Sequence, residues 1–189
     1  MSSRNIFLKK ILILGLPIVL NLVFSLSDIL NNSTKIHYDA GIWFYMGSLI
    51  LAGKIPYLDF YEHYPPNISY TYALLMLLTG NSFILFRLCF VIITLLTIFC
   101  VYLLAKRMYS ETVAIIAVYL LCLNSQIIFW TKMLLSEPIS NFFFFSGFLF
   151  LIKADTEEKW SRITILGIIS GFLFSVAFLY RPTVACLFP

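Results

Sequence analysis

Residues 83–105 read FILFRLCFVIITLLTIFCVYLLA, a run in which Arg87 is the one charged side chain. About 20 apolar residues in a helix cross the hydrocarbon core of a bilayer, so this stretch predicts a transmembrane helix. The whole chain of 189 residues is 61% hydrophobic and 12% charged, whereas soluble domains carry about 25% charged residues. The sequence therefore predicts an all-α, polytopic membrane protein.

Apolar runs of similar length predict a transmembrane bundle of about five spans. Their approximate bounds are Ile6–Leu26, Phe83–Ala105, Thr112–Phe129, Met133–Ile152 and Ile163–Tyr180. A shorter run, Ile68–Leu78, predicts an interfacial or re-entrant helix, and counting it as a span would reverse the topology after it. Because the chain ends just after the fifth run, we expect residues 1–189 to be the N-terminal part of a larger transmembrane domain.

The basic residues give the five-span bundle an orientation, since Lys and Arg favour the cytoplasmic loops. With a cytoplasmic N-terminus, eight of them lie inside: Arg4, Lys9, Lys10, Lys106, Arg107, Lys153, Lys159 and Arg162. Four lie outside: Lys35, Lys54, Lys132 and Arg181. This orientation places a long first loop, about residues 28–82, the turn at 124–137 and Arg181 on one outer face. In a bacterium the membrane would be the cytoplasmic membrane.

The first outer loop contains HYDAGIWFYMGSLILAGKIPYLDFYEHYPP, residues 37–66, and holds both histidines of the chain. Apolar residues at 3–4 spacing predict an interfacial amphipathic helix over Asp39–Ala52, ended by Gly53. Asp39 suits the N-cap or the first turn of that helix, where the helix dipole favours an acid. Further on, Glu62 and His63 are neighbours that offer oxygen and nitrogen ligands to a divalent cation. The alternative is a tyrosine-rich interfacial anchor with solvated charges.

Two further charged residues lie at the predicted outer face. Glu137 precedes Pro138, which suits a first helical turn, so Ser136 or Glu137 is expected to cap that helix. A carboxylate at a membrane boundary must be hydrated, paired or used, and Lys132 is a candidate partner for Glu137. Arg181 fits either an interfacial anchor that reaches the lipid headgroups or a ligand for phosphate.

Several short motifs carry a family resemblance. The first-loop pattern is, in order, Asp39, Tyr45, Gly47, Gly53, Pro56-Tyr57, Asp59-Phe60, and Glu62 before Pro65-Pro66. The later motifs are Phe86-Arg87, Ser136-Glu137-Pro138 and Tyr180-Arg181-Pro182. Together they resemble the GT-C membrane glycosyltransferases, and most closely the bacterial branch related to protein O-mannosyltransferases and the aminoarabinose transferase of lipid A. Later spans and the usual outer C-terminal domain of that family are not in these 189 residues.

The resemblance implies a transferase that moves a sugar from a polyprenyl-phosphate donor to a glycan, lipid or protein acceptor at the outer face. Asp39 corresponds to the first-loop acid and acts as the general base, while Glu137 orients it or the acceptor. Glu62, with His63, corresponds to a metal-associated acid, so a divalent cation is the expected cofactor. Arg181, Lys132 or that cation stabilises the departing phosphate. The substrate-binding residues expected are Tyr57, Asp59, Tyr64, Arg87, Lys132 and Arg181.

Other functions fit the sequence less well. The basic residues form no cluster, so nucleic acid is not an expected partner. No Gly-rich nucleotide loop occurs, which agrees with a lipid-linked donor. A transporter would carry ionisable residues at mid-membrane depth, where these runs have almost none. A non-catalytic membrane scaffold or assembly subunit stays open as the alternative, since it needs no acids at the outer face.

Overall fold

The computed structural model describes residues 3–31, 35–62, 65–80 and 82–183. These residues form eight helices and no strand, which confirms the predicted all-α class. The helices are α1 Ser3–Leu30, α2 Tyr38–Leu51, α3 Asn67–Thr79, α4 Phe83–Met108, α5 Glu111–Cys122, α6 Ser125–Lys132, α7 Glu137–Asp155 and α8 Trp160–Tyr180.

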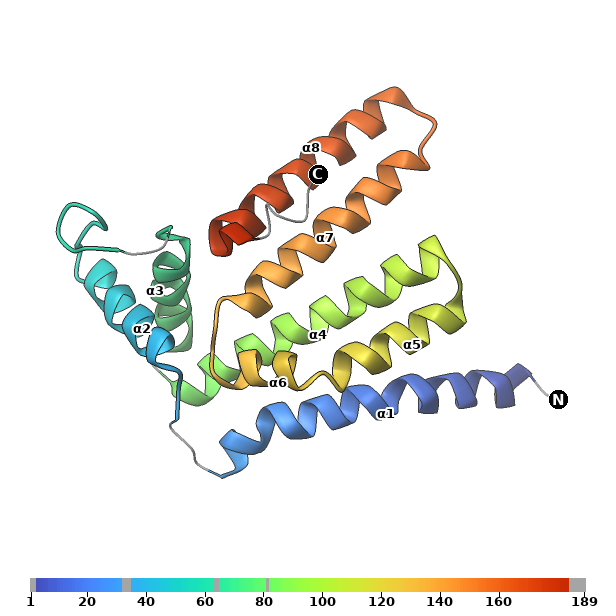
Figure 1. Ribbon diagram of the computed structural model, residues 1–189, viewed down its shortest axis with the longest axis horizontal. Coiled ribbons are helices and arrows are strands. Elements are labelled where there is room, and N and C mark those ends of the chain that lie inside the picture. Colours follow the sequence, from blue (N-terminus) through green and yellow to red (C-terminus); the bar gives the residue numbers. More distant parts are fainter. Residues whose placement is uncertain (1–2, 32–34, 63–64, 81, 184–189) are drawn as a thin grey trace.

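The long helices pack side by side, while the short helices of the first loop gather at one end (Figure 1). α7 packs against α4 and α8, and α4 also packs against α5, which in turn contacts α1. α2 and α3 lie together at the end where α7 begins and α8 ends, and the α4–α5 and α7–α8 connections lie at the other end (Figure 1). The predicted outer segments therefore share one end of the molecule. Which membrane face that end meets stays a prediction.

The structure supports fewer membrane spans than the sequence predicts. α4 and α8 are long and apolar enough to cross a membrane. α5 and α6 reach that length only together, with a bend of 54° between them. The described residues therefore provide two spans, or three if the bent pair is one broken span. Each of the five predicted runs is mainly helical, but the five-span count is not confirmed.

The predicted run Thr112–Phe129 is not one continuous helix, because Asn124 starts a new one. The Asn124 side chain accepts hydrogen bonds from the backbone N–H groups of Gln126, at 2.9 Å, and Ile127, at 3.3 Å. It thereby satisfies N–H groups that a helix start leaves open. At the end of α5, the carbonyl of Cys122 accepts a hydrogen bond of 3.0 Å from the buried side chain of Asn21 in α1. The Asn21 side chain thus satisfies a backbone carbonyl at the break. A helix break inside a bilayer needs such a partner, because no water is present there to bond the backbone.

The predicted run that begins at Met133 also starts later in the structure. Residues 133–136 form a turn, and α7 begins at Glu137 with Pro138 in its first turn. Proline has no backbone N–H to give to a preceding helical turn, so the helix starts here rather than continuing from Met133. Ser136 occupies the N-cap position but makes no side-chain capping bond. Leu134 in this turn has a positive φ of 58° and is fully buried.

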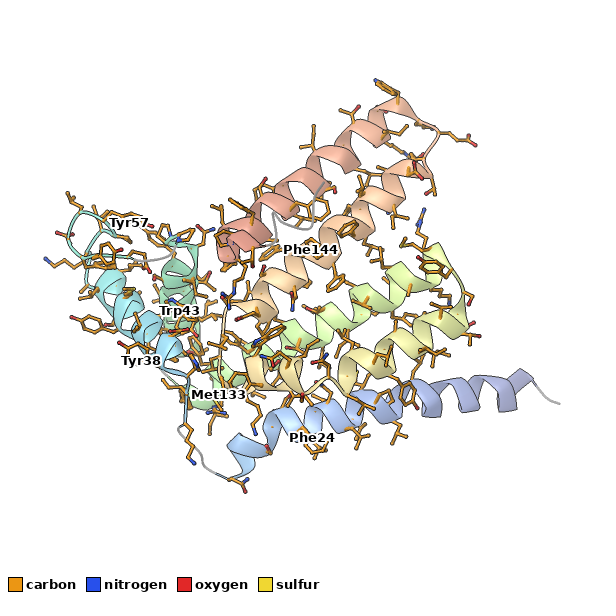
Figure 2. The ribbon with its side chains drawn as sticks, viewed as in Figure 1. Phe24, Tyr38, Trp43, Tyr57, Met133 and Phe144 are labelled. Atoms are coloured by element: carbon orange, nitrogen blue, oxygen red, sulfur yellow. The ribbon has the colours of Figure 1, made fainter. Side chains whose placement is uncertain are left out.

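α2 and α3 form the first-loop layer, much as predicted. α2 spans Tyr38–Leu51 and is followed by Gly53 with a φ of +81°, a conformation that favours glycine at a helix end. α3 confirms a helix over the run Ile68–Leu78, while its interfacial placement stays a prediction. Both pack into a core shared with the start of α4 and of α7; the core is Ala40, Trp43, Ile68, Tyr72, Phe86, Phe90, Leu134, Leu135 and Ile139. Figure 2 shows Trp43 among the side chains where α2 and α3 meet.

Candidate active site

Asp39 lies in the first turn of α2, while His37 holds the N-cap position. The prediction of a first-turn acid is confirmed, and the N-cap alternative for Asp39 is wrong because the His37 ring takes that role. His37 Nδ1 accepts a hydrogen bond of 3.2 Å from the Asp39 N–H. The same nitrogen is 3.4 Å from Asp39 Oδ2.

Glu137 and Arg181 form an ion pair between the start of α7 and the end of α8. Arg181 Nη2 donates to Glu137 Oε1. The Glu137 side chain is 11% exposed and the Arg181 side chain 36%. In the described part of the chain, Glu137 Oε2 is buried and has no hydrogen-bond partner. Most buried polar atoms have a hydrogen-bond partner, so Glu137 Oε2 is a candidate acceptor for a water molecule or a ligand hydroxyl.

The partner of Glu137 thus differs from the one that the sequence suggested. Lys132 Nζ instead donates to Ser27 Oγ at 3.1 Å, which links the end of α6 to α1. Lys132 is the last residue of α6, and this helix ends just before the turn that leads into α7 (Figure 1).

Glu62 is buried, at 3% exposure, in the segment that leads into α3. Its Oε2 accepts a hydrogen bond of 2.5 Å from the hydroxyl of Ser69. The proposed second ligand, His63, and the predicted substrate residue Tyr64 lie outside the described residues. Among the side chains that the structure does describe, no group of three or more His, Cys, Asp or Glu residues could hold a metal. Cation binding by Glu62 and His63 stays a prediction.

Tyr57 and Asp59 lie in a tight turn beyond α2 at the edge of the molecule (Figure 2). Asp59 Oδ2 accepts a hydrogen bond of 2.8 Å from the Ile55 N–H, and the Tyr57 N–H donates to the Phe60 carbonyl at 2.9 Å. Tyr57 has a positive φ of 65°, an uncommon conformation for a side chain of this size. Desolvation, followed by the charge of Glu62, raises the pKa of the Tyr57 phenol. Substrate binding by Tyr57 and Asp59 stays a prediction.

Arg87 is buried near the start of α4 and has a structural contact that the sequence did not predict. Its Nη2 donates a hydrogen bond of 2.6 Å to the Lys35 carbonyl, and its guanidinium lies 4.7 Å from the centroid of the Phe83 ring. These contacts fasten the start of the first loop to α4. Substrate binding by Arg87 stays a prediction.

The structure brings some predicted site residues together directly and others only onto the same core. Glu137 and Arg181 are in contact, whereas Asp39 and Glu137 share no hydrogen bond or ion pair in the described part of the chain. Ala40 beside Asp39 nonetheless belongs to the same hydrophobic cluster as Leu135 and Ile139 on either side of Glu137. The His37 ring also meets Phe129 of α6, with centroids 6.4 Å apart. Asp39 and Glu137 therefore border one packed core.

Sequence reasoning missed three polar residues of α3: Ser69, Thr71 and Tyr72. Besides the bond from Ser69 to Glu62, the Tyr72 hydroxyl donates to the Leu134 carbonyl, and Thr71 Oγ1 is 2.5 Å from the Tyr180 hydroxyl. Hydroxyl groups in an apolar run could have signalled these bonds, because a buried hydroxyl needs a partner. The partners of Thr71 and Tyr72 lie 109 and 62 positions away in sequence, so local pattern could not predict them.

Comparison with known proteins gives one family. A family model described as dolichyl-phosphate-mannose-protein mannosyltransferase matches residues 63–189. The match includes Glu137 and Arg181, and Asp39 precedes it. No curated protein sequence and no solved structure gives a significant match to the chain.

Proposed function

Since the chain belongs to the dolichyl-phosphate-mannose-protein mannosyltransferase family, we propose that it moves a sugar from a polyprenyl-phosphate donor to an acceptor at the extracytoplasmic face. The family and the apolar helices make the chain part of a membrane glycosyltransferase. The proposal adds the type of donor, the side of the membrane and the residues that act. Asp39 is the general base, and Glu137 with Arg181 forms the opposite part of the site.

The observation that carries this proposal is the ion pair between the nearly buried Glu137 and the half-buried Arg181. Glu137 uses Oε1 for the arginine, and Oε2 is left for the hydroxyl or amine of an acceptor. A guanidinium carries five N–H donors, so Arg181 can keep Glu137 and also bind a phosphate oxygen. The pair thus supplies Glu137 Oε2 for the acceptor and the Arg181 guanidinium for the phosphate of the donor.

The reaction follows from these roles. The acceptor oxygen or nitrogen attacks the anomeric carbon, while the Asp39 carboxylate takes the acceptor proton. The bond between the anomeric carbon and the phosphate oxygen breaks, and its electron pair leaves with the polyprenyl phosphate. Arg181 and Lys132 stabilise that developing negative charge. A divalent cation, where one binds, would be held by Glu62 and His63 and would add positive charge beside the phosphate.

Replacement of Asp39 by Asn tests the base in the full-length protein. Asn keeps the shape of the side chain and its position in the first turn of α2, but it cannot accept the proton. Loss of a general base lowers the rate on the order of 10²–10⁴-fold. The measurement is transfer of labelled mannose or aminoarabinose from a polyprenyl-phosphate donor in membranes, at matched amounts of folded protein.

A comparison variant separates the base from the proposed cation site. Glu62→Gln is expected to lower transfer less than Asp39→Asn, and the loss should depend on the concentration of added Mg²⁺. Calorimetric Mg²⁺ binding to the purified protein gives a readout besides activity. Near-normal transfer by the Asp39→Asn protein would show that the acid is structural.

A further inference from the structure

Two adjacent residues of α3 bond to the segments that carry Glu137 and Arg181. Tyr72 contacts the turn that leads into Glu137, and Thr71 contacts the residue that precedes Arg181. α3 belongs to the first loop, whereas the pair belongs to α7 and α8. Neither residue touches the ion pair itself, so their effect on it must be positional.

The Tyr72 contact fixes the start of α7. Tyr72 is fully buried, and its hydroxyl donates to the carbonyl of Leu134, three residues before Glu137. Leu134 is itself fully buried and has a positive φ of 58°, which a leucine adopts only when its surroundings enforce it. The hydrogen bond from the Tyr72 hydroxyl is one of the contacts that enforce this backbone conformation. It therefore helps to set the path of the chain into Glu137.

The Thr71 contact fixes the end of α8. Thr71 Oγ1 and the Tyr180 hydroxyl are 2.5 Å apart, and Tyr180 is the last residue of α8 before Arg181. The Tyr180 ring also stacks on Phe143 of α7, with centroids 6.0 Å apart and planes 6° apart. Tyr180 thus connects α3, α7 and α8 beside the guanidinium.

α3 is in turn packed closely on α2, the helix that carries Asp39. The Trp43 and Phe44 rings meet the Tyr72 ring edge-on, with centroids 5.8 and 5.0 Å away. At Gly47 the two helices approach so closely that a Cβ there would lie 3.0 Å from the Ala73 backbone nitrogen. A shift of α3 relative to α7 and α8 would therefore carry α2 with it.

We propose that Thr71 and Tyr72 are positioning residues that set the Glu137–Arg181 pair against the first-loop helices. The proposal rests on the proposed function, because it assigns these bonds to the placement of Asp39 relative to that pair. Groups that act on one substrate must be held close to the reacting geometry, and an error of about 1 Å costs on the order of 100-fold in rate. The expected effect is a loss of kcat of about tenfold or more with little change in the donor KM, because the groups that bind the donor remain.

The test uses variants that remove only the two hydroxyls, in the full-length protein in membranes. Tyr72→Phe and Thr71→Val keep the size of each side chain. Their matched controls are Tyr70→Phe, at an exposed position of the same helix, and Thr79→Val. Within the described part of the chain, the Thr79 hydroxyl bonds only to the Leu75 carbonyl one turn earlier. Initial rates against the concentration of polyprenyl-phosphate mannose give kcat and KM separately. A kcat in both test variants equal to that of the controls would overturn the proposal.

A distance measurement keeps the test independent of activity. Spin labels at Leu77 of α3 and Phe172 of α8, both exposed, report the separation of these helices in a background without the four native cysteines. The double variant Thr71→Val/Tyr72→Phe should give a broader or displaced distance distribution than the control Tyr70→Phe/Thr79→Val. If the wild-type protein transfers no sugar but the distribution changes, the proposed function fails and the positioning role stands. Identical distributions in the two double variants would refute the positioning role.

Discussion

Glu137 and Arg181 show how a nearly buried carboxylate is paired with a cation. The Glu137 side chain is nearly buried, and Arg181 forms an ion pair with one of its two carboxylate oxygens. Taking a carboxylate out of water is costly, and removal of its partner leaves an uncompensated buried charge. The pair is therefore both a candidate site and a structural requirement. Experiments can separate the two roles. The free energy of unfolding depends on whether the charges balance, whereas the rate of sugar transfer depends on which group stands at each position.

We expect Arg181→Gln to destabilise the protein by about 2 kcal/mol or more. In a chain of this size that corresponds to a fall of roughly 4–8 °C in the midpoint of thermal unfolding, measured in detergent. The double variant Glu137→Gln/Arg181→Gln should recover most of the loss, since it leaves no unpaired charge.

The matched control is Arg162→Gln, which breaks the pair with Glu157 at the other end of α8. That pair has a separation of 3.7 Å, and its arginine side chain is 62% exposed. Exposed pairs contribute about 0–1 kcal/mol, so the control should change the midpoint little. Equal shifts for Arg181→Gln and Arg162→Gln would contradict the view that Glu137 depends on its partner.

At the level of single residues, the sequence predicted positions better than partners. Asp39 in a first turn, Gly53 after a helix and Pro138 at a helix start follow from local backbone chemistry, and each is found in the structure. The partner of Glu137 does not follow from local chemistry, because Lys132 and Arg181 are both plausible cations at the same end. Only packing of α7 on α8 selects Arg181.

At the level of elements, hydrophobicity predicted the helices but not their interruptions. An apolar run needs its backbone bonded internally, which favours a helix throughout. The run Thr112–Phe129 breaks because the side chain of Asn124 caps a new helix and Asn21 satisfies the old one. Such breaks depend on side chains that compete with the backbone for hydrogen bonds, one of them 101 positions away. Apolar periodicity contains no signal for that competition.

The contact between α2 and α3 yields a prediction about two glycines of α2. At Gly47 an added Cβ would lie 3.0 Å from the backbone nitrogen of Ala73 and 3.2 Å from Tyr72 Cβ, so Gly47→Ala must push the helices apart. Overpacking of this kind costs typically 1–3 kcal/mol, which exceeds the roughly 1 kcal/mol that alanine gains in helix propensity. We expect a lower thermal midpoint and, because α3 moves, a lower rate of sugar transfer.

Gly41→Ala is the control on the same helix. Among the described residues its Cβ would meet only Ile36 Cδ1, at 3.7 Å, which is an ordinary contact, so the propensity gain should leave stability unchanged or raised. If both alanine variants behaved alike in the thermal measurement, the close approach of α2 and α3 would not be a feature of the folded protein.

At the level of the whole molecule, the arrangement of the connections constrains the topology. The first-loop helices, the start of α7 and the end of α8 lie at one end, and the α4–α5 and α7–α8 connections lie at the other (Figure 1). A bilayer between the two ends would place each set on one side. Basic residues favour the cytoplasm, and Lys106, Arg107, Lys153, Lys159 and Arg162 all lie at or beside the α4–α5 and α7–α8 connections. The end that carries Glu137 and Arg181 is therefore expected to be extracytoplasmic.

Thiol labelling tests this orientation in a background without the native cysteines. Leu58→Cys, in an exposed turn of the first loop, should react in intact cells with a reagent that does not cross membranes. Glu158→Cys, in the exposed α7–α8 connection, should react only after permeabilisation. Both positions are at the surface, so a difference in labelling reports the side of the membrane rather than burial. Reaction of both in intact cells would place the two ends on one side, and Asp39, Glu137 and Arg181 could then not form a site reached only from outside.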